Sequence, residues 1–357
     1  RLYMLNSPLL KADDLIFLDK GVKDTTRQVL IPLWNAYSFL STYAVADNWQ
    51  PDTDLLEGKV PNASHDFDLW IISRLQSLVK DVATHMKEYK LYLVVSRVLN
   101  FIEDLTNWYI RLNRRRFWGA GEELTKDQSD AYRSLFYVLS EFTKILAPYA
   151  PFISDKIYKN LFSEEKNISV HLCDMPELNE EFVNLELEKR MDLLRIAINQ
   201  GRSLRQKHKI KIRQALLSMT IVVASEEDKK ILTKGDLLLK RELNVKNIVY
   251  TTDETSHVRL TLKPNFKTLG KKLGKNLRNV QKHLLSLNNS HTKVNDFLKQ
   301  LSINGSVTVA DHNLGECDII MERAPIDDRL ISTDQGVTIL FDTSLTEELI
   351  REGWSRE

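Results

Sequence analysis

Apolar residues in the first 200 positions recur at intervals of three and four, which is the spacing that lines one face of an α-helix. The pattern predicts helices over residues 21–43, from 66 onward, and over 90–117, 126–146 and 152–158. We expect Ser64 or Asp66 to cap the second of these helices, because both side chains accept hydrogen bonds from free N–H groups. Long helices with short connections favour an antiparallel bundle.

The pattern changes near residue 201, where short alternating segments replace the long helical repeats. Strands are predicted over residues 216–223, 248–250, 258–262, 307–309 and 337–341. Helices are predicted over residues 181–207, 226–239, 266–287 and 293–302, and an extended piece over 169–172. The predicted fold class is therefore mainly α, with a helical bundle at residues 21–200 and a smaller α+β domain at 201–357.

Residues 107–118, called the Arg-Trp segment below, hold four arginines, four aromatic residues and no acid. At 100° per residue, a helix here buries an apolar stripe and presents four residues on its opposite face: Asn107, Arg111, Arg114 and Trp118. Arginine forks bind phosphates, and aromatic rings stack on unpaired bases. The segment predicts single-stranded or looped RNA as its ligand. A solvated helix end, with arginines offsetting the helix dipole and pairing with surface acids, has about equal weight.

Two further segments are basic and free of acidic residues, at 201–214 and 263–282. In the first, cations alternate with Ile210 and Ile212, as in a strand with one charged edge that could follow a phosphate backbone. A solvated loop explains that segment equally well. In the second, the apolar spacing is helical, so an ordinary solvated outer face is the favoured interpretation.

The composition of 357 residues is that of a globular chain with a net charge of +1, so any nucleic-acid contact must come from local clusters of charge. Two distant cysteines exclude a disulfide scaffold and a Cys-pair zinc module, and they suit a reducing cytoplasm. No apolar run is expected to approach the roughly 20 residues of a membrane span, and residues 1–6 do not read as a signal peptide. Both ends read as mid-domain sequence, which predicts a fragment of a longer protein.

Catalytic motifs are also missing from the sequence. It contains no phosphate-binding loop, no dinucleotide fingerprint and no nucleophile elbow. Its eight histidines are not spaced as metal ligands. We therefore expect a chain that binds a partner and that has no catalytic residue and no metal of its own.

Six segments, taken in order, resemble the part of isoleucyl-tRNA synthetase that follows its catalytic domain, in the eukaryotic cytosolic type. They are residues 1–8, 107–118, 146–152, 242–246, 263–274 and 351–357. The helix break at Pro148 is shared with the valine, leucine and methionine enzymes, whereas the Arg-Trp segment favours isoleucine. Fungal and animal cytosolic forms fit, and some bacteria carry a eukaryote-like version.

The resemblance implies that the bundle is an anticodon-binding domain and that residues 1–20 are the end of the connection from a catalytic domain. The parent enzyme would attach isoleucine to tRNA(Ile) with ATP and Mg²⁺ in the cytoplasm. The HIGH and KMSKS elements are missing, so this fragment would be inactive alone, with no cofactor and no membrane or DNA partner. The residues expected to bind tRNA are Trp108, Arg111, Arg114, Arg115, Arg116, Trp118, Arg205, Lys207, Lys209, Lys211 and Arg213.

Two alternatives stay open at this stage. The first is an appendage that docks other synthetases or scaffold proteins. The second is the equivalent part of a valine or leucine enzyme. Trp108 could also pack inside the bundle, and Arg116 lies nearer the apolar side of its helix than the other arginines do.

Overall fold

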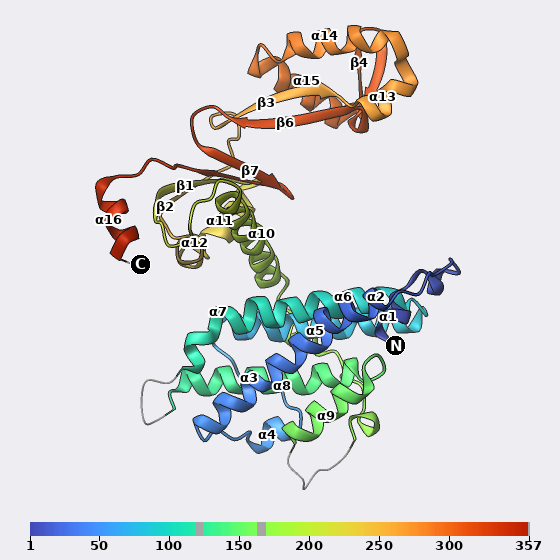
Figure 1. The fold of residues 1–357 in the computed structure, drawn as a ribbon, viewed down its shortest axis with the longest axis vertical. Helices are drawn as coiled ribbons and strands as arrows, with labels where there is room; N and C mark the ends of the chain where they lie inside the picture. The colour runs from blue at the N-terminus through green and yellow to red at the C-terminus, as the bar shows by residue number, and fades with distance from the viewer. Residues whose placement is uncertain (119–123, 163–168, 356–357) are drawn as a thin grey trace. The chain divides into compact units, whose positions relative to one another are not determined.

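The computed structural model describes residues 1–118, 124–162 and 169–355, which form two compact units, Arg1–Glu188 (unit 1) and Lys189–Glu357 (unit 2) (Figure 1). The sequence places this boundary twelve residues later, at 200/201. The difference arises at helix α10, Leu185–Lys207, which is predicted as the last helix of the bundle. The side chain of Gln200 donates to the backbone of Asp334 and Val337, so most of α10 belongs with the sheet of unit 2.

Unit 1 is helical in the residues described. Its helices are α1 Leu2–Leu5, α2 Asp19–Thr25, α3 Ile31–Ala46, α4 Thr53–Leu56, α5 Asp66–Lys87, α6 Leu91–Glu103, α7 Arg111–Asn113, α8 Lys126–Leu146 and α9 Pro151–Leu161. Short 3₁₀ turns lie at η1 Pro8–Lys11, η4 Arg114–Phe117, η6 Val170–Leu172 and η7 Glu180–Phe182, and wider π-helical turns at η2 Thr26–Leu30 and η3 Asp104–Ile110. The extended piece predicted at residues 169–172 was wrong, because a 3₁₀ turn stands there.

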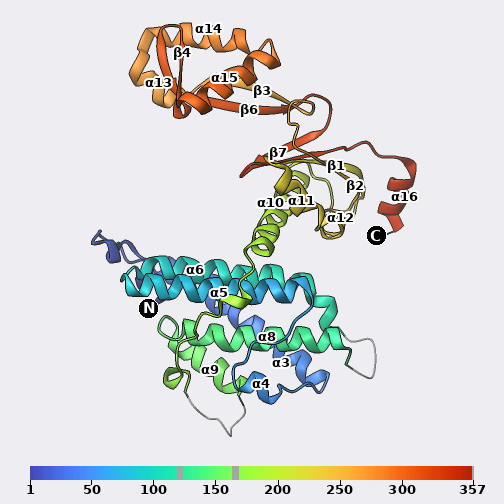
Figure 2. The ribbon, with the colours of Figure 1, turned by 180° about the vertical axis from the view of Figure 1, so that it is seen from behind.

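The core of unit 1 lies where α5 packs against α6 and α8 (Figure 2). The apolar stripe predicted through α6 and η3 is buried, including Val94, Phe101 and Leu105. Pro32 has no N–H to donate to the preceding turn, and the chain passes through the π-helical turn η2 just before it. The predicted bundle is therefore confirmed, with its helices running through widened turns.

The helix cap predicted at Ser64 or Asp66 falls instead on the residue between them. His65 is the N-cap of α5, and its Nδ1 accepts the N–H of Phe67 at 3.2 Å. The sequence argument missed it because histidine is not among the usual capping residues.

One helical stretch, Asp19–Ala46, is long and apolar enough to cross a membrane by length and composition alone. This stretch differs from the expectation that no apolar run approaches a membrane span, because polar residues interrupt its apolar sequence. Helices that form the core of a globular domain pass the same test. Val29, Leu33, Ala36 and Leu40 are buried inside unit 1, whereas Ile31, Trp34 and Val45 are exposed.

Unit 2 contains a four-stranded sheet in the order β2 (Val245–Thr251), β1 (Leu216–Val222), β8 (Val337–Phe341) and β7 (Leu330–Asp334). The β1–β2 pair is parallel and is connected through α11 (Glu226–Thr233) and α12 (Asp236–Leu243), while β8 is antiparallel to both of its neighbours. The sequence predicted β1, β2 and β8 but missed β7, whose alternation is weak and whose position is at the sheet edge.

The rest of unit 2 is built on two antiparallel pairs, β3 (Val258–Pro264) with β6 (Ile319–Pro325), and β4 (Ser306–Val309) with β5 (His312–Gly315). Helices α13 (Phe266–Leu273), α14 (Leu277–Leu287) and α15 (His291–Asn304) supply apolar side chains to the same core. The single helix predicted at 266–287 was wrong. It breaks at Gly274, whose φ of +48° lies in the left-handed region. The short turns η8 (Gly274–Asn276) and η9 (Glu316–Asp318) and helix α16 (Glu347–Ser355) complete the elements.

Candidate nucleic-acid interface

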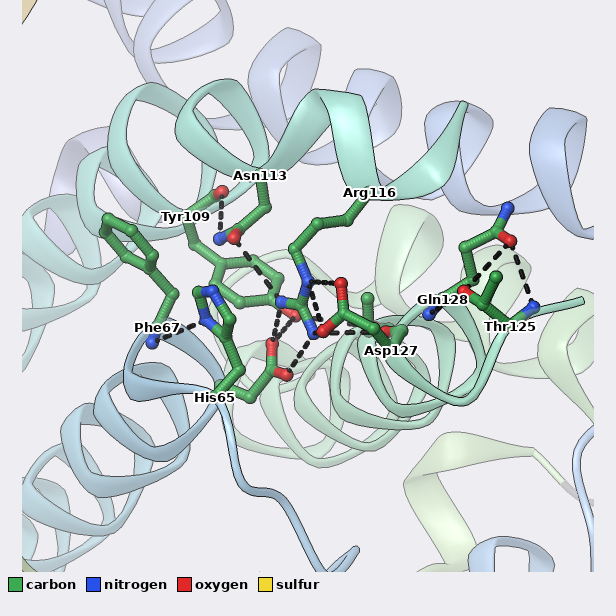
Figure 3. Close-up of polar contacts among 10 residues, drawn as sticks. His65, Phe67, Tyr109, Asn113, Arg116, Thr125, Asp127 and Gln128 are labelled. Carbon is green, nitrogen blue, oxygen red and sulfur yellow. Dashed lines mark hydrogen bonds and ion pairs between the residues drawn. The ribbon is translucent and has the colours of Figure 1, made fainter. Parts of the chain in front are cut away.

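The end of the Arg-Trp segment is fixed to the bundle by Arg116 (Figure 3). Its guanidinium donates two hydrogen bonds to the carboxylate of Asp68, at 2.9 and 2.8 Å, and its Nε reaches Asp127 Oδ2 at 2.9 Å. Asp68 is fully buried at the start of α5 and also accepts the hydroxyl of Tyr109 at 2.7 Å. Arg116 therefore joins the starts of α5 and α8 to η4.

The surroundings of Arg116 and Tyr109 shift the pKa of both side chains. Burial alone would lower the pKa of Arg116, but the hydrogen bonds and charges of Asp68 and Asp127 outweigh burial and raise it. Burial, followed by the neighbouring charge of Asp68, raises the pKa of Tyr109 well above its ordinary value, so the phenol stays a hydrogen-bond donor. Arg116, predicted to bind tRNA, is committed to an internal ion pair, and we remove it from the candidate interface.

Trp108 is the second correction to the candidate set. Its side chain is only 3% exposed, and the guanidinium of Arg111 covers the ring at 5.6 Å from the ring centre. A base cannot reach this ring to stack on it. Trp108 anchors η3 to the core, as the second interpretation of this residue allowed.

Arg205 is the third correction. It is 2% exposed, and its guanidinium donates to four backbone carbonyls, those of Lys211, Gln214, Leu243 and Asn244, at 2.6 to 3.1 Å. Burial lowers its pKa to about 10. Arg205 therefore closes the loop after α10 against the start of β2, and it offers no charge to a ligand.

Five residues of the Arg-Trp segment face outward and are called the Arg-Trp face: Asn107, Arg111, Arg114, Arg115 and Trp118. Arg114 and Arg115 are exposed and have no acidic partner within the part of the chain that the structure describes. Trp118 is 52% exposed, and its indole N–H donates to the hydroxyl of Tyr43 at 2.8 Å. Arg111 is half-buried, with its Nε bonded to the carbonyl of Asn107 at 2.8 Å.

A groove of about 590 Å³ lies beside this face, and Asn107 and Arg114 are among its lining residues. Polar side chains line it from two sides, from η2 and α3 on one and from α6, η3 and η4 on the other: Arg27, Gln28, Asn35, Asn100, Glu103, Thr106, Asn107 and Arg114. Amides both donate and accept hydrogen bonds, so this lining suits the edge of an unpaired base. Sequence reasoning missed Gln28, Asn35 and Asn100. The available signal was polar residues inside otherwise apolar helices.

The four remaining candidates surround the turn that follows α10 in unit 2. Lys207, Lys209 and Lys211 are exposed and Arg213 is half-buried. The strand-like alternation predicted for them was wrong, because the segment is a pair of turns in which Lys209 has a φ of +56°. Their exposure keeps the three lysines as candidates for a backbone contact with nucleic acid.

Comparison with known proteins defines the class of this interface. Residues 68–221 match the family described as "Anticodon-binding domain of tRNA ligase". The match covers the helices that carry the Arg-Trp face and Arg116. Residues 68–221, which include most of the bundle and the start of unit 2, are thus similar to the anticodon-binding domain of a tRNA ligase.

The particular relatives are isoleucine–tRNA ligases, to which the chain is homologous along its whole length. Identity is 40% with the enzyme of Protochlamydia amoebophila, 39% with that of Chlamydia trachomatis and 38% with that of Chlamydia pneumoniae. Each alignment covers all of this chain and 33 to 34% of the relative, so the chain spans about a third of their length. These relatives are bacterial and give no support to a eukaryotic cytosolic type.

Proposed function

We propose that unit 1 binds the anticodon loop of an isoleucine tRNA on the Arg-Trp face. The observation that carries the proposal is that one segment contains both side chains held inside the bundle and exposed cations. Arg116 and Trp108 are held inside the bundle, while Arg114, Arg115 and Trp118 are left exposed. The internal contacts of Arg116 and Trp108 position the exposed cations, and such positioning reduces the entropy lost on binding.

Each group on the face has a chemical role in this proposal. Arg114 and Arg115 bind phosphates of the loop through charge-assisted hydrogen bonds. The ring of Trp118 stacks on an unpaired base and is held in position by Tyr43. The amides of the groove form hydrogen bonds with a base edge and supply the discrimination between anticodons.

The activity of the whole protein is part of the same proposal. The names of the relatives support an isoleucine–tRNA ligase. We propose, on the resemblance of the six segments, that it forms isoleucyl-adenylate from isoleucine and ATP, with Mg²⁺, and then charges tRNA(Ile). Residues 1–20 are proposed to lead from its catalytic part, on the resemblance of their first eight residues. The described ranges contain no cluster of three or more His, Cys, Asp or Glu suited to a metal. We place the protein in the cytoplasm, on the basis of its two free cysteines, and assign it to the eukaryote-like type that some bacteria carry, on the basis of the six resembling segments.

The test of this proposal is the double variant Arg111→Ala with Arg114→Ala. Losing a hydrogen bond to a charged group costs about 1.5–3 kcal/mol, so we expect tRNA(Ile) to bind at least about tenfold more weakly in a low-salt gel shift. The matched control is Lys90→Ala with Arg97→Ala, which removes two exposed cations from the same unit. Circular dichroism should show both variants folded. Equal affinity of the test and control variants would remove the Arg-Trp face from the interface.

Competition between RNAs separates this function from the alternatives. A tRNA with an isoleucine anticodon should displace one with a scrambled loop. A surface that docks another synthetase or a scaffold protein would show no preference between the two. Preference for a valine or leucine anticodon would assign the chain to a sister enzyme.

A further inference from the structure

The longest acid-free stretch of the chain lies in unit 2, outside the proposed anticodon interface. Residues 258–295 contain nine lysines and arginines and no aspartate or glutamate. The whole chain is balanced, with 50 Lys and Arg against 49 Asp and Glu. The structure folds this stretch into β3, α13, α14 and the start of α15.

The apolar and cationic residues of α14 occupy different faces of the helix. Val280 and Leu284 are fully buried in the core of unit 2. Arg278 and Lys282 are exposed and stand one helical turn apart on the outer side. On the neighbouring α13, Lys267 is exposed as well.

Among the described residues, no acidic side chain pairs with any of these three cations. Within the same stretch, Lys263 pairs with Glu322 at 2.6 Å and Lys272 with Asp318 at 3.1 Å. On helix α12, Lys240 pairs with Asp236 at 2.7 Å. Like charges at positions i and i+4 destabilise a helix slightly, so Arg278 and Lys282 are a small cost to the isolated fold.

The surroundings of these cations favour a phosphate backbone over an acidic protein. Asn276 at the end of η8 and Asn279 and Gln281 on α14 are exposed and offer amide donors beside the two cations. Protein interfaces depend on clusters of aromatic or apolar anchors that become buried, whereas the described residues of α13 and α14 include one exposed large apolar side chain each, Phe266 and Leu285. Cations flanked by amides match the contacts that proteins make with phosphate and sugar oxygens.

We propose that the outer surface of α13 and α14, called the α13–α14 surface and defined by Lys267, Arg278 and Lys282, is a second RNA contact. It binds the sugar–phosphate backbone and does not read bases. The identity of that RNA as tRNA rests on the proposed function. The surface itself rests on the distribution of charge in unit 2.

The test is Arg278→Ala with Lys282→Ala in the full chain, with tRNA binding measured by filter retention over a series of salt concentrations. Each lost phosphate contact lowers the slope of log K against log salt by about 0.7–0.9. We expect a slope reduced by about 1.5 and a weaker affinity, to the same extent for tRNA(Ile) and for a scrambled-loop tRNA.

The matched control is Lys229→Ala with Lys230→Ala on α11. It removes the same charge from a helix that also carries Glu226, Glu227 and Asp228, and it should leave the slope unchanged. A plain RNA duplex is the second probe. Arg278→Ala with Lys282→Ala should weaken binding of the duplex relative to wild type. The same two changes should also weaken it relative to the Arg111→Ala, Arg114→Ala variant when they are added to that variant.

The outcomes separate the two proposals. An unchanged slope for both tRNA and duplex overturns the α13–α14 surface, whether or not the anticodon preference persists. A loss confined to tRNA(Ile) also overturns it, because a backbone contact cannot depend on the anticodon. Reduced binding of poly-glutamate with unchanged RNA binding would assign the surface to an acidic protein. If wild type shows no preference for the isoleucine anticodon, but Arg278→Ala with Lys282→Ala still reduces the salt slope, only the anticodon proposal is overturned.

Discussion

At the scale of single residues, similar side chains have opposite roles in this chain. Arg114 and Arg116 are two positions apart in one turn, yet one is exposed and the other holds a buried carboxylate. The difference comes from Asp68, which lies 48 residues away from Arg116 in the sequence. Removing Arg116 should therefore affect stability, whereas removing its exposed neighbours should affect binding.

The variant Arg116→Ala is expected to destabilise unit 1 by about 3–5 kcal/mol, because it leaves the carboxylate of Asp68 buried without its cation. Arg115→Ala, next to it and exposed, should change stability by no more than about 0.5 kcal/mol. Urea unfolding followed by circular dichroism measures both. Equal stability of the two variants would contradict the structural role of Arg116.

His65 gives unit 1 a predictable dependence on pH. Burial, and then the charge of Arg116, lower the pKa of His65 below its ordinary value of 6.5. The folded state therefore binds this proton less tightly than the unfolded chain does, so stability falls as the pH drops through 6.5. Protonated Nδ1 can no longer accept the N–H of Phe67.

We expect His65→Asn, which keeps a capping side chain, to lose less stability than wild type between pH 7 and pH 5. The measurement is the free energy of unfolding at several pH values. Parallel pH profiles for the two proteins would show that His65 does not set this dependence.

At the scale of elements, local signals predicted the helix starts and stops unevenly. The cap of α8 follows from four adjacent residues, since Thr125 and Gln128 form a reciprocal capping box. The break between α13 and α14 could not be predicted, because the helical spacing of apolar residues continues through Gly274. The sequence alone does not indicate which backbone conformation a glycine adopts, because that conformation depends on where the neighbouring elements require the chain to turn.

Two glycines of this region should respond in opposite directions to the same substitution. Gly274→Ala forces a side chain into the left-handed region and should cost about 1–2 kcal/mol. Gly270→Ala, inside α13, has open space around the added methyl and should stabilise the helix by up to about 1 kcal/mol. Thermal unfolding of the two variants tests this pair, and a shift of the same sign in both would contradict the assigned break.

At the scale of the whole chain, a net charge of +1 leaves no general attraction for nucleic acid, so affinity must arise from local surfaces. The Arg-Trp face of unit 1 combines cations with an exposed indole and an amide-lined groove, which suits unpaired bases. The α13–α14 surface of unit 2 has cations and amides and suits a backbone. The two proposals thus assign selectivity and salt-dependent affinity to different parts of the molecule.

The sequence by itself determined the helical bundle, the α+β character of the second part and the segments where positive charge gathers. These depend on periodicity and composition, which are local. Only the tertiary structure decided which cations remain available, because the guanidinium of Arg116 pairs with a buried carboxylate and that of Arg205 is buried against carbonyls of other segments. It also moved α10 to the second unit, since the partners of a helix depend on residues more than a hundred positions away.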